Sequence, residues 1–321
     1  MPGVFYNGGL VYLETNEKMR FVYDERKAPL GSGAMGDVYE GYIYKTQKRV
    51  AIKKVKDYFA NKPEIRRRAK LEASLMFRHR NLVEMLGYCE ASQDSGALYI
   101  ISNFVQGTNI DKFVQQNIRR DSNFVKKVCE LIFPIFDALS YIHANKIWHM
   151  DIKPSNIMVE HGSNVRLMDL GIVQVSESSG SRNSGLLGTP SYAAPEQFMS
   201  DSSRTSKVDA RTDLYELGVT IYELLTGKNP YVANSVSEAK KRHQTVVLPS
   251  DPIIPVPVQE ILHKATSPNP SDRFSSASEM KQALKMALNK KSHYDIPYII
   301  IVSVSIIIIL IIFITLLVYI S

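Results

Sequence analysis

Cysteine is almost absent from this sequence of 321 residues, which contains only Cys89 and Cys129. Two cysteines cannot build a disulfide framework, and no Cys or His spacing typical of a zinc site is present. We therefore expect two buried thiols in a reducing compartment. The chain also lacks the composition of a disordered protein, because 45% of it is hydrophobic and 22% is charged. Its length allows one large domain or two lobes that share a cleft.

A secretory signal peptide is lacking as well, because Met1–Leu13 has no basic stretch followed by a long apolar core. Asn7-Gly8-Gly9 instead predicts a turn between two short strands, Val4–Tyr6 and Leu10–Leu13. Residues 1–22 are therefore expected to form an N-terminal extension.

Acidic residues are fewer than basic ones, and the formal net charge is +7. This balance suits nucleotide phosphates, acidic lipid headgroups or nucleic acid. No nucleic-acid recognition motif supports the last of these, so we expect no nucleic-acid partner. The densest basic run, Arg66–Arg68 with Lys70, is interpreted as one solvated helix face.

The chain has no internal repeat, and its pattern changes near Gly107. Strand signals precede this point, at Lys27–Leu30, Val38–Tyr44, Arg49–Val55 and Leu98–Phe104, with one helix signal at Pro63–Arg78. Helical periodicity follows it, at Phe124–Ala144, Asp213–Thr226 and Ser276–Leu288. The pattern predicts an α+β protein with a small β-rich lobe, a larger helical lobe and a hinge near Asn103–Gly107.

One long uncharged run, Tyr298–Ile320, lies near the C-terminus. As a helix it would span roughly 34 Å, slightly more than a bilayer core. A buried core helix is the alternative, but the run is too long and too uniform for it. Lys285, Lys290 and Lys291 lie just before the run, so the positive-inside rule places the preceding chain in the cytoplasm. We expect a single-pass membrane protein with a juxtamembrane segment at 291–297.

A glycine-rich loop, Leu30-Gly31-Ser32-Gly33-Ala34-Met35-Gly36-Asp37-Val38, has the pattern G-x-G-x-x-G. Glycines let backbone N–H groups approach phosphate oxygens without a side-chain clash. The pattern alone is weak, since glycines also mark ordinary turns. The residues after Gly36 predict a strand rather than a helix, which favours a hairpin over phosphates and not a dinucleotide site.

Lys53 follows this loop at the end of an apolar strand, Val50-Ala51-Ile52. A surface lysine is the alternative, but the spacing favours a phosphate contact. Such a lysine needs a carboxylate partner from the next helix, and Glu72 is the first candidate, with Glu64 second.

The segment His149–Asn156 places a carboxylate (Asp151), an ammonium (Lys153) and a carboxamide (Asn156) in one loop before a short strand, Ile157–Val159. A second strand, Val165–Met168, ends at Asp169. Asn156 and Asp169 offer the hard oxygen ligands that Mg²⁺ prefers. Asp151 can accept a hydroxyl proton.

This order of motifs resembles the eukaryotic-type protein kinases of the Ser/Thr branch, and is similar to the members of that family found in bacteria. The resemblance runs from about Arg26 to Leu288 and includes Ala194-Pro195-Glu196, which matches A-P-E. It implies a bilobal kinase domain at 23–290, with lobes at about 23–105 and 106–290. The membrane helix at 298–320 is expected from the uncharged run alone. The resemblance also implies structural roles for Glu196, which pairs with Arg273, and for Asp213, which bonds the catalytic loop.

The resemblance implies that ATP and Mg²⁺ are cofactors and that proteins are substrates. Asp151 would deprotonate the substrate hydroxyl, Lys153 would steady the γ-phosphate, and Asn156 and Asp169 would bind Mg²⁺. Val38, Ala51 and Met158 would sandwich the adenine. The expected ATP-binding residues are Leu30, Gly31, Ser32, Gly33, Ala34, Met35, Gly36, Val38, Ala51, Lys53, Ser102 at the gatekeeper position, Asn103, Phe104, Val105 and Met158.

Three positions depart from the family pattern. H-R-D becomes His149-Met150-Asp151, and the absent arginine usually contacts a phosphate on the activation loop. D-F-G becomes Asp169-Leu170-Gly171. The stretch after Glu72 is about two residues short, so the usual spacing would put Lys70 where the helix glutamate belongs.

A membrane-anchored Ser/Thr protein kinase, in a bacterial plasma membrane, is the function that these motifs indicate. The alternative is a pseudokinase that binds nucleotide or acts as a scaffold. Phosphorylation in the Ser-rich segment Ser176–Ser184 and self-association of the chain are both left open.

Overall fold

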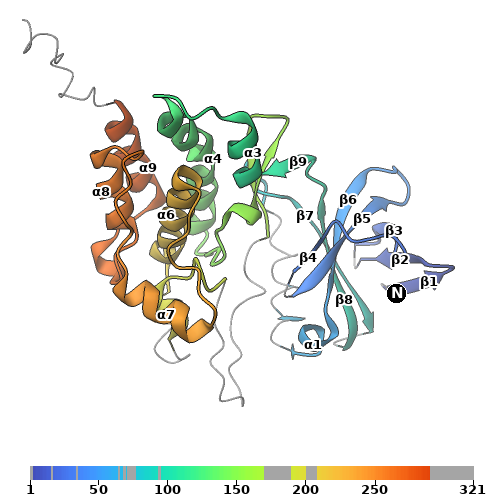
Figure 1. The fold of residues 1–321 in the computed structure, drawn as a ribbon. Helices are drawn as coiled ribbons and strands as arrows, with labels where there is room; N and C mark the ends of the chain where they lie inside the picture. The colour runs from blue at the N-terminus through green and yellow to red at the C-terminus, as the bar shows by residue number, and fades with distance from the viewer. Residues whose placement is uncertain are drawn as a thin grey trace, which may run out of the picture.

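The computed structural model describes residues 3–15, 17–33, 35–63, 66–67, 70, 77–92, 95–169, 189–199 and 208–289. A β-rich lobe and a helical lobe lie side by side, at the right and left of Figure 1. The α+β, two-lobed arrangement expected from the pattern change near Gly107 is confirmed.

The first lobe is built on one large antiparallel sheet with strand order β1-β2-β3-β5-β6-β8-β7, and β4 pairs with β5 outside this path. Its elements are β1 (Gly3–Asn7), β2 (Leu10–Glu14), β3 (Arg20–Asp24), β4 (Gly31–Ser32), β5 (Gly36–Ile43), β6 (Arg49–Val55), the short helix α1 (Asp57–Ala60), β7 (Met85–Ser92) and β8 (Ser95–Asn103).

Both faces of this sheet carry apolar clusters. Alternate residues of β6 and β8 point to opposite faces, so Val55 and Ile100 lie in the cluster that faces the second lobe, whereas Ile52 and Ile101 lie in the other. The second cluster is covered by the N-terminal hairpin β1–β2, which contributes Val11 and Leu13 with no exposed surface.

The N-terminal extension is thus part of the sheet, and it also reaches the opposite edge of that sheet. The Cys89 thiol on β7 donates to the carbonyls of Gly3 (3.3 Å) and Glu14 (3.0 Å), which brings the start of β1 and the end of β2 to β7. Burial raises the pKa of Cys89 to about 11 and that of Cys129 to about 12, so both thiols stay protonated. The expectation of two buried thiols is confirmed.

The strand predictions for the first lobe are mixed. The hairpin about Asn7-Gly8-Gly9 forms as expected, and Arg49–Val55 is β6. The prediction of a strand at Lys27–Leu30 is wrong, because β3 ends at Asp24 and the chain turns before β4 begins at Gly31. β3 and β7 were not anticipated from the sequence.

The chain leaves the first lobe where the hinge was expected. β8 ends at Asn103, and β9 (Gly107–Asn109) already belongs to a second sheet of order β11-β10-β9, with β10 (Ile157–Glu160) and β11 (Asn164–Leu167). Any side chain at Gly107 would collide with the backbone carbonyl of Val159, which explains the glycine at this crossing.

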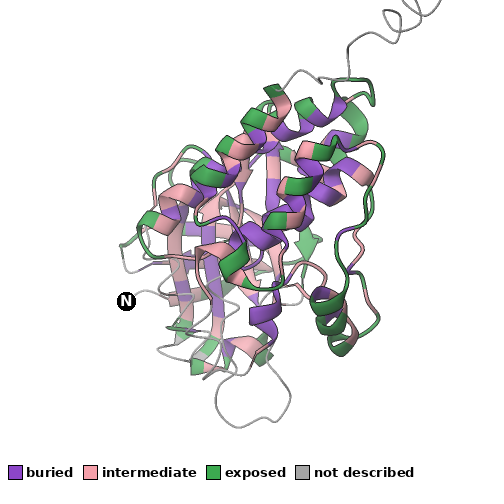
Figure 2. Ribbon diagram, turned by 90° about the vertical axis from the view of Figure 1, so that its left-hand side faces the viewer, coloured by how far each residue is buried: buried purple, intermediate pink, exposed green. Residues whose placement is uncertain are grey.

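The second lobe packs helices around α4 (Phe124–Ala144), whose predicted bounds agree with the structure. The apolar face of α4 meets α6 and α9 in a core that Figure 2 shows as inward-facing buried stripes. The helices are α3 (Ile110–Asn117), α4, α6 (Ala210–Thr226), α7 (Val236–Thr245), α8 (Val256–Ala265) and α9 (Ala277–Asn289), with short 3₁₀ turns η1 (Pro154–Asn156), η3 (Pro195–Phe198) and η4 (Pro270–Asp272).

The helix expected at Pro63–Arg78 lies mostly outside the described residues. Within it, Arg66 corrects one expectation, because its side chain is not solvated. It is 2% exposed, pairs with Glu90 at 2.7 Å and donates to the Gly96 carbonyl. The two terminal guanidinium nitrogens thus each have an acceptor, which offsets part of the cost of burying the charge.

The membrane segment expected at Tyr298–Ile320 also lies outside the described residues. Within the part of the chain that the structure describes, no helix has the length and apolar character needed to cross a bilayer.

Candidate active site

The loop from His149 to Ile152 is held by side chains at four consecutive backbone N–H groups. Asp213 on α6 accepts from His149 N (2.9 Å) and Met150 N (2.8 Å), and His149 Nδ1 accepts from Asp151 N (3.3 Å). Glu216, one turn further along α6, accepts from Ile152 N (2.7 Å). The bond expected between Asp213 and this loop is therefore present.

Met150, which stands where the family has arginine, does not disturb this loop. Its φ is +59°, and its side chain is buried. Its carbonyl accepts a hydrogen bond from Gln197 Nε2 at 3.1 Å. A non-glycine residue with a left-handed backbone conformation is strained, and the surrounding hydrogen bonds hold Met150 in this conformation.

The carboxylate of Asp151 lies at the centre of a group of donors and is 4% exposed. Its Oδ1 accepts from the Thr189 hydroxyl (2.7 Å) and the Thr189 N–H (3.0 Å). Its Oδ2 lies 2.8 Å from Lys153 Nζ and 3.0 Å from Asn156 Nδ2. Lys153 Nζ also donates to the Thr189 hydroxyl at 2.5 Å. The site thus already binds one alcohol between a carboxylate and an ammonium group.

Asn156 and Asp169 lie at the same end of the β10–β11 hairpin. The register pairs Ile157 with Leu167, so the residues just outside this pair are neighbours, and Met168 N donates to the Asn156 carbonyl at 2.8 Å. Lys53 Nζ lies 3.1 Å from Asp169 Oδ2. The positive charge of Lys53 is the main reason that the pKa of Asp169 is lowered.

This pair of residues fits Mg²⁺. An ionised carboxylate and a carboxamide oxygen are the donor types that Mg²⁺ selects, and it usually takes only a few protein ligands and keeps several waters. Among the described residues no group of three or more His, Cys, Asp or Glu could hold a metal ion.

The glycine-rich loop forms part of a hairpin, as expected. Gly31 pairs with Val38 across β4 and β5, and Gly33 N donates to the Gly36 carbonyl at 2.9 Å. A Cβ atom at Gly31 would meet nothing within 4 Å, so its backbone is open to a ligand. Gly36 has a different role, because a Cβ atom there would collide with the Lys54 carbonyl of β6. Ala34 lies outside the described residues.

The expected adenine walls share one face of the sheet. Val38 lies opposite Lys53, and Ala51 lies opposite Ser102, and all four therefore point to the same side. Met158 packs against the apolar cluster on that side.

The hinge residues expected to face the adenine lie beside this face. Asn103 N donates to the Glu84 carbonyl at 2.9 Å, so this N–H is already engaged. Phe104 stacks under the Arg49 guanidinium, and Val105 is buried. Leu30, Ser32 and Met35 lie along the glycine-rich loop, where Leu30 is exposed.

The partner expected for Lys53, Glu72, and its alternative, Glu64, lie outside the described residues. Lys70, the residue at the family's usual spacing, is described. Its Nζ lies 3.0 Å from Glu90 Oε2 on β7, beside the Arg66 pair with the same carboxylate. Lys70 therefore helps to tie this part of the chain to the sheet.

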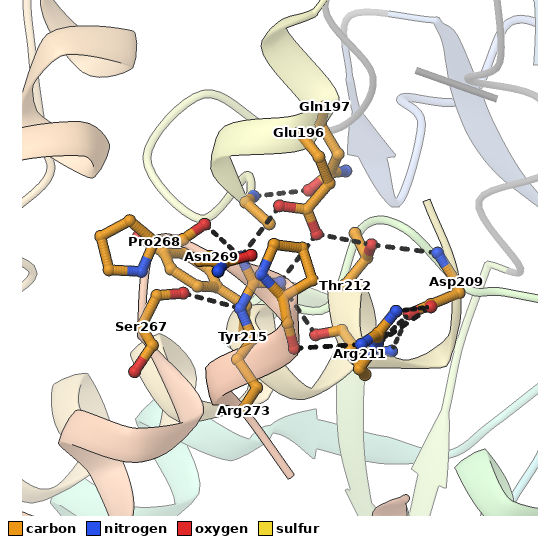
Figure 3. Close-up of polar contacts among 12 residues, drawn as sticks. Glu196, Gln197, Asp209, Arg211, Thr212, Tyr215, Ser267, Pro268, Asn269 and Arg273 are labelled. Carbon is orange, nitrogen blue, oxygen red and sulfur yellow. Dashed lines mark hydrogen bonds and ion pairs between the residues drawn. The ribbon is translucent and has the colours of Figure 1, made fainter. Parts of the chain in front are cut away.

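Figure 3 shows the pair of Glu196 and Arg273. Both side chains are almost fully buried. Two guanidinium nitrogens of Arg273 contact the two carboxylate oxygens at 2.7 and 2.9 Å. Arg273 also donates to the carbonyls of Ser267 and Arg211, and Thr212 donates to Glu196 Oε1. This network fixes η3 against α6 and η4.

Three contributors to the site were missed by sequence reasoning: Thr189 as the partner of Asp151, and Glu216 and Gln197 as supports of the catalytic loop. Each lies between 38 and 64 residues away along the chain from the group that it contacts. Glu216 had one available signal, since it lies one turn after Asp213 and therefore on the same side of the helix.

Glu216 should make the stability of this protein depend on pH. Burial, and then the charge of Asp213, raises the pKa of its carboxyl well above the ordinary value of 4.5. The folded protein keeps a proton here that the unfolded chain releases above that value. Folding stability therefore falls as pH rises from about 4.5 toward the raised pKa, by up to ~1.4 kcal/mol per pH unit.

The variant Glu216→Gln should lack this dependence. Its free energy of unfolding, measured with urea at pH values from about 5 to about 8, should increase relative to the unsubstituted protein as the pH rises. Glu130→Gln, at an exposed position on α4, serves as the control and should show no such trend. Parallel pH curves for Glu216→Gln and the unsubstituted protein would mean that Glu216 is ionised in the fold.

A family model described as the protein kinase domain matches residues 24–288. The chain is 29% identical over 267 residues to the serine/threonine-protein kinase PrkC of Bacillus subtilis, which covers 81% of this chain and 40% of PrkC. It is 32% identical over 294 residues to the probable serine/threonine-protein kinase PknB of Corynebacterium glutamicum, covering 86% of this chain and 44% of that protein. The chain thus spans about four tenths of the length of these curated relatives.

The fold is also similar to a solved structure. The crystal structure of the kinase domain of Mycobacterium tuberculosis PknI superposes with a TM-score of 0.60 at 24% identity. The match covers 89% of this chain and 99% of that one. At this identity the likeness concerns the fold alone.

Proposed function

Since this chain belongs to the protein kinase family, we propose that it transfers the γ-phosphoryl group of ATP to Ser or Thr hydroxyls of proteins. The observation that supports this most directly is the contact of Asp151 and Lys153 with the Thr189 hydroxyl. A substrate Ser or Thr hydroxyl in the same place would meet a carboxylate that accepts its proton and an ammonium group beside it.

In this proposal each residue has one task. Asp151 orients the substrate hydroxyl and takes its proton as the oxygen forms a bond to the γ-phosphorus and the bond to the β–γ bridging oxygen breaks. Lys153 lies beside the transferred group and offsets its negative charge. Mg²⁺ held by Asn156 and Asp169 would neutralise charge on the phosphates. Catalysis would then rest on positioning and electrostatics, both of which the rigid loop from His149 to Ile152 favours.

The proposal is tested with the full chain in detergent, given labelled ATP and Mg²⁺ and a set of Ser- and Thr-containing peptides. Label should appear on Ser or Thr and should require Mg²⁺. Absence of label together with Mg²⁺-dependent ATP binding would place the chain among the pseudokinases.

We also propose that Tyr298–Ile320 anchors the chain in a bacterial plasma membrane with the kinase domain on the cytoplasmic side. The support is the uncharged apolar run and the lysines that precede it. When the full chain is expressed in bacteria, it should sediment with the membranes and should not be extracted from them by alkaline carbonate.

Two positive charges within Tyr298–Ile320 should abolish the retention of the chain in the membrane fraction. The double variant Ile308→Arg, Leu310→Arg adds roughly 5–7 kcal/mol to the free energy of insertion, so it should leave the membrane fraction. Retention of the double variant in carbonate-washed membranes would contradict the anchor.

A further inference from the structure

Helix α7 contacts the loop that follows Thr189 through one buried histidine. His243 is 1% exposed, and its Nε2 lies 2.8 Å from the Pro190 carbonyl. Its other ring nitrogen, Nδ1, lies 2.7 Å from the Tyr215 hydroxyl on α6. The imidazole thus bridges the buried helix α6 and the loop beside Asp151.

The direction of both hydrogen bonds follows from the chemistry of the partners. A carbonyl only accepts, so Nε2 must carry the hydrogen, and the Tyr215 hydroxyl donates to Nδ1. Burial lowers the pKa of His243 to about 4, so the ring is neutral at physiological pH. The Tyr231 ring stacks on it at a centroid distance of 4.1 Å, which fixes its plane.

The histidine is also connected to the buried ion pair. The Arg273 guanidinium lies over the Tyr215 ring, 4.7 Å from its centroid. A continuous set of contacts therefore runs from Glu196 through Arg273, Tyr215 and His243 to Pro190. The side chains of Glu196, Arg273, Tyr215 and His243 are all buried.

The loop is bound at three successive residues. His243 holds the Pro190 carbonyl, Asn229 Nδ2 donates to the Ser191 carbonyl at 3.1 Å, and the Tyr192 hydroxyl donates to Glu223 at 2.6 Å. Thr189, immediately before these residues, contacts Asp151. The loop 189–193 therefore adjoins the carboxylate that would receive a substrate hydroxyl, and residues flanking that hydroxyl would lie close to it.

We propose that His243 is a positioning residue for the protein substrate: by fixing the carbonyl of Pro190 it sets the shape of the loop 189–193 that receives the residues flanking the phosphoacceptor. The inference rests on the proposed kinase function. It adds a determinant of substrate selection that lies on α7, does not touch the reacting atoms and leaves the nucleotide site untouched.

The test uses the full chain in detergent and a library of Ser- and Thr-containing peptides with randomised flanking positions. His243→Phe keeps a flat buried ring but donates nothing to Pro190. The substitution should raise KM for the preferred peptide about 3- to 10-fold, the effect of one lost hydrogen bond. It should also weaken the preference of the protein for particular residues beside the phosphoacceptor. KM for ATP should stay within about twofold. His243→Gln, whose amide nitrogen can reach the position of Nε2, should restore most of the peptide KM.

An independent readout does not need activity. Hydrogen exchange of the backbone amides of Thr189, Ser191, Tyr192 and Ala193 should be faster in His243→Phe than in the unsubstituted chain, and unchanged in Lys240→Ala, an exposed control on α7. If the unsubstituted chain transfers no phosphate, the proposed function fails, and this exchange still decides whether His243 holds the loop.

Two results overturn the inference. One is unchanged peptide KM, flanking preference and hydrogen exchange in His243→Phe. The other is an equal rise of KM for peptide and for ATP, which would mean that His243 only stabilises the fold.

Discussion

Asp151→Asn should lower phosphoryl transfer to protein by about 10²- to 10⁴-fold, the range that one general base contributes. ATP binding should change little, because asparagine keeps the size of Asp151 and the expected adenine walls Val38 and Ala51 and the glycine-rich loop lie on the first lobe. The rate is measured with labelled ATP and a peptide, and ATP affinity is measured separately by titration.

The physical reason is that Thr189, Lys153 and Asn156 all present donors to this carboxylate. An amide cannot take a proton at physiological pH, and its NH₂ group would point at Lys153 and Asn156 or at Thr189, which also donate. Asp137→Asn, at an exposed position on α4, is the matched control and should keep full activity. Full transfer by Asp151→Asn would exclude Asp151 as the base.

Arg273→Met should destabilise the fold by about 3–5 kcal/mol, the range measured when one partner of a buried ion pair is removed. Methionine keeps much of the apolar stem but leaves the Glu196 carboxylate without its guanidinium partner at a position that is 1% exposed. It also removes the donors to the carbonyls of Ser267 and Pro268. Denaturant unfolding followed by circular dichroism measures the change.

Two further variants separate charge burial from general disruption. Glu196→Gln combined with Arg273→Met removes both charges and should recover part of the lost stability, because no unpaired ion is then left inside. Arg26→Ala breaks an exposed pair with Asp24 and should shift the unfolding midpoint far less. If Arg273→Met unfolds at the same denaturant concentration as the unsubstituted chain, the pair is not a structural requirement.

The parts of the fold that the sequence predicts well are those whose local pattern is strong. α4 combines ten buried positions at helical spacing, and β6 is flanked by clear breaks. β7 was missed because it contains Gly87 and because bulges interrupt its pairing. The strand wrongly expected at Lys27–Leu30 includes Pro29, which lacks the N–H group that a sheet would use.

The candidate catalytic and metal-binding residues were predictable because their carboxylate, ammonium and amide groups lie within short motifs. Asp151, Lys153 and Asn156 all fall inside the single segment His149–Asn156. Their supports were not predictable in the same way. Gln197, Glu216 and His243 make their contacts only after η3, α6 and α7 have packed, and no local sequence pattern records such contacts.

The N-terminal hairpin lies before the region that matches the kinase family, yet it is paired into the sheet of the first lobe. The match to the protein kinase domain begins at residue 24, whereas β1 of the sheet already begins at Gly3. Val11 and Leu13 seal an apolar surface formed by Ile52, Tyr99 and Ile101, all of which belong to the shared part. A chain truncated at residue 24 would therefore keep every catalytic motif but expose an apolar face of its sheet to water. We expect such a chain to aggregate rather than to behave as an independent enzyme.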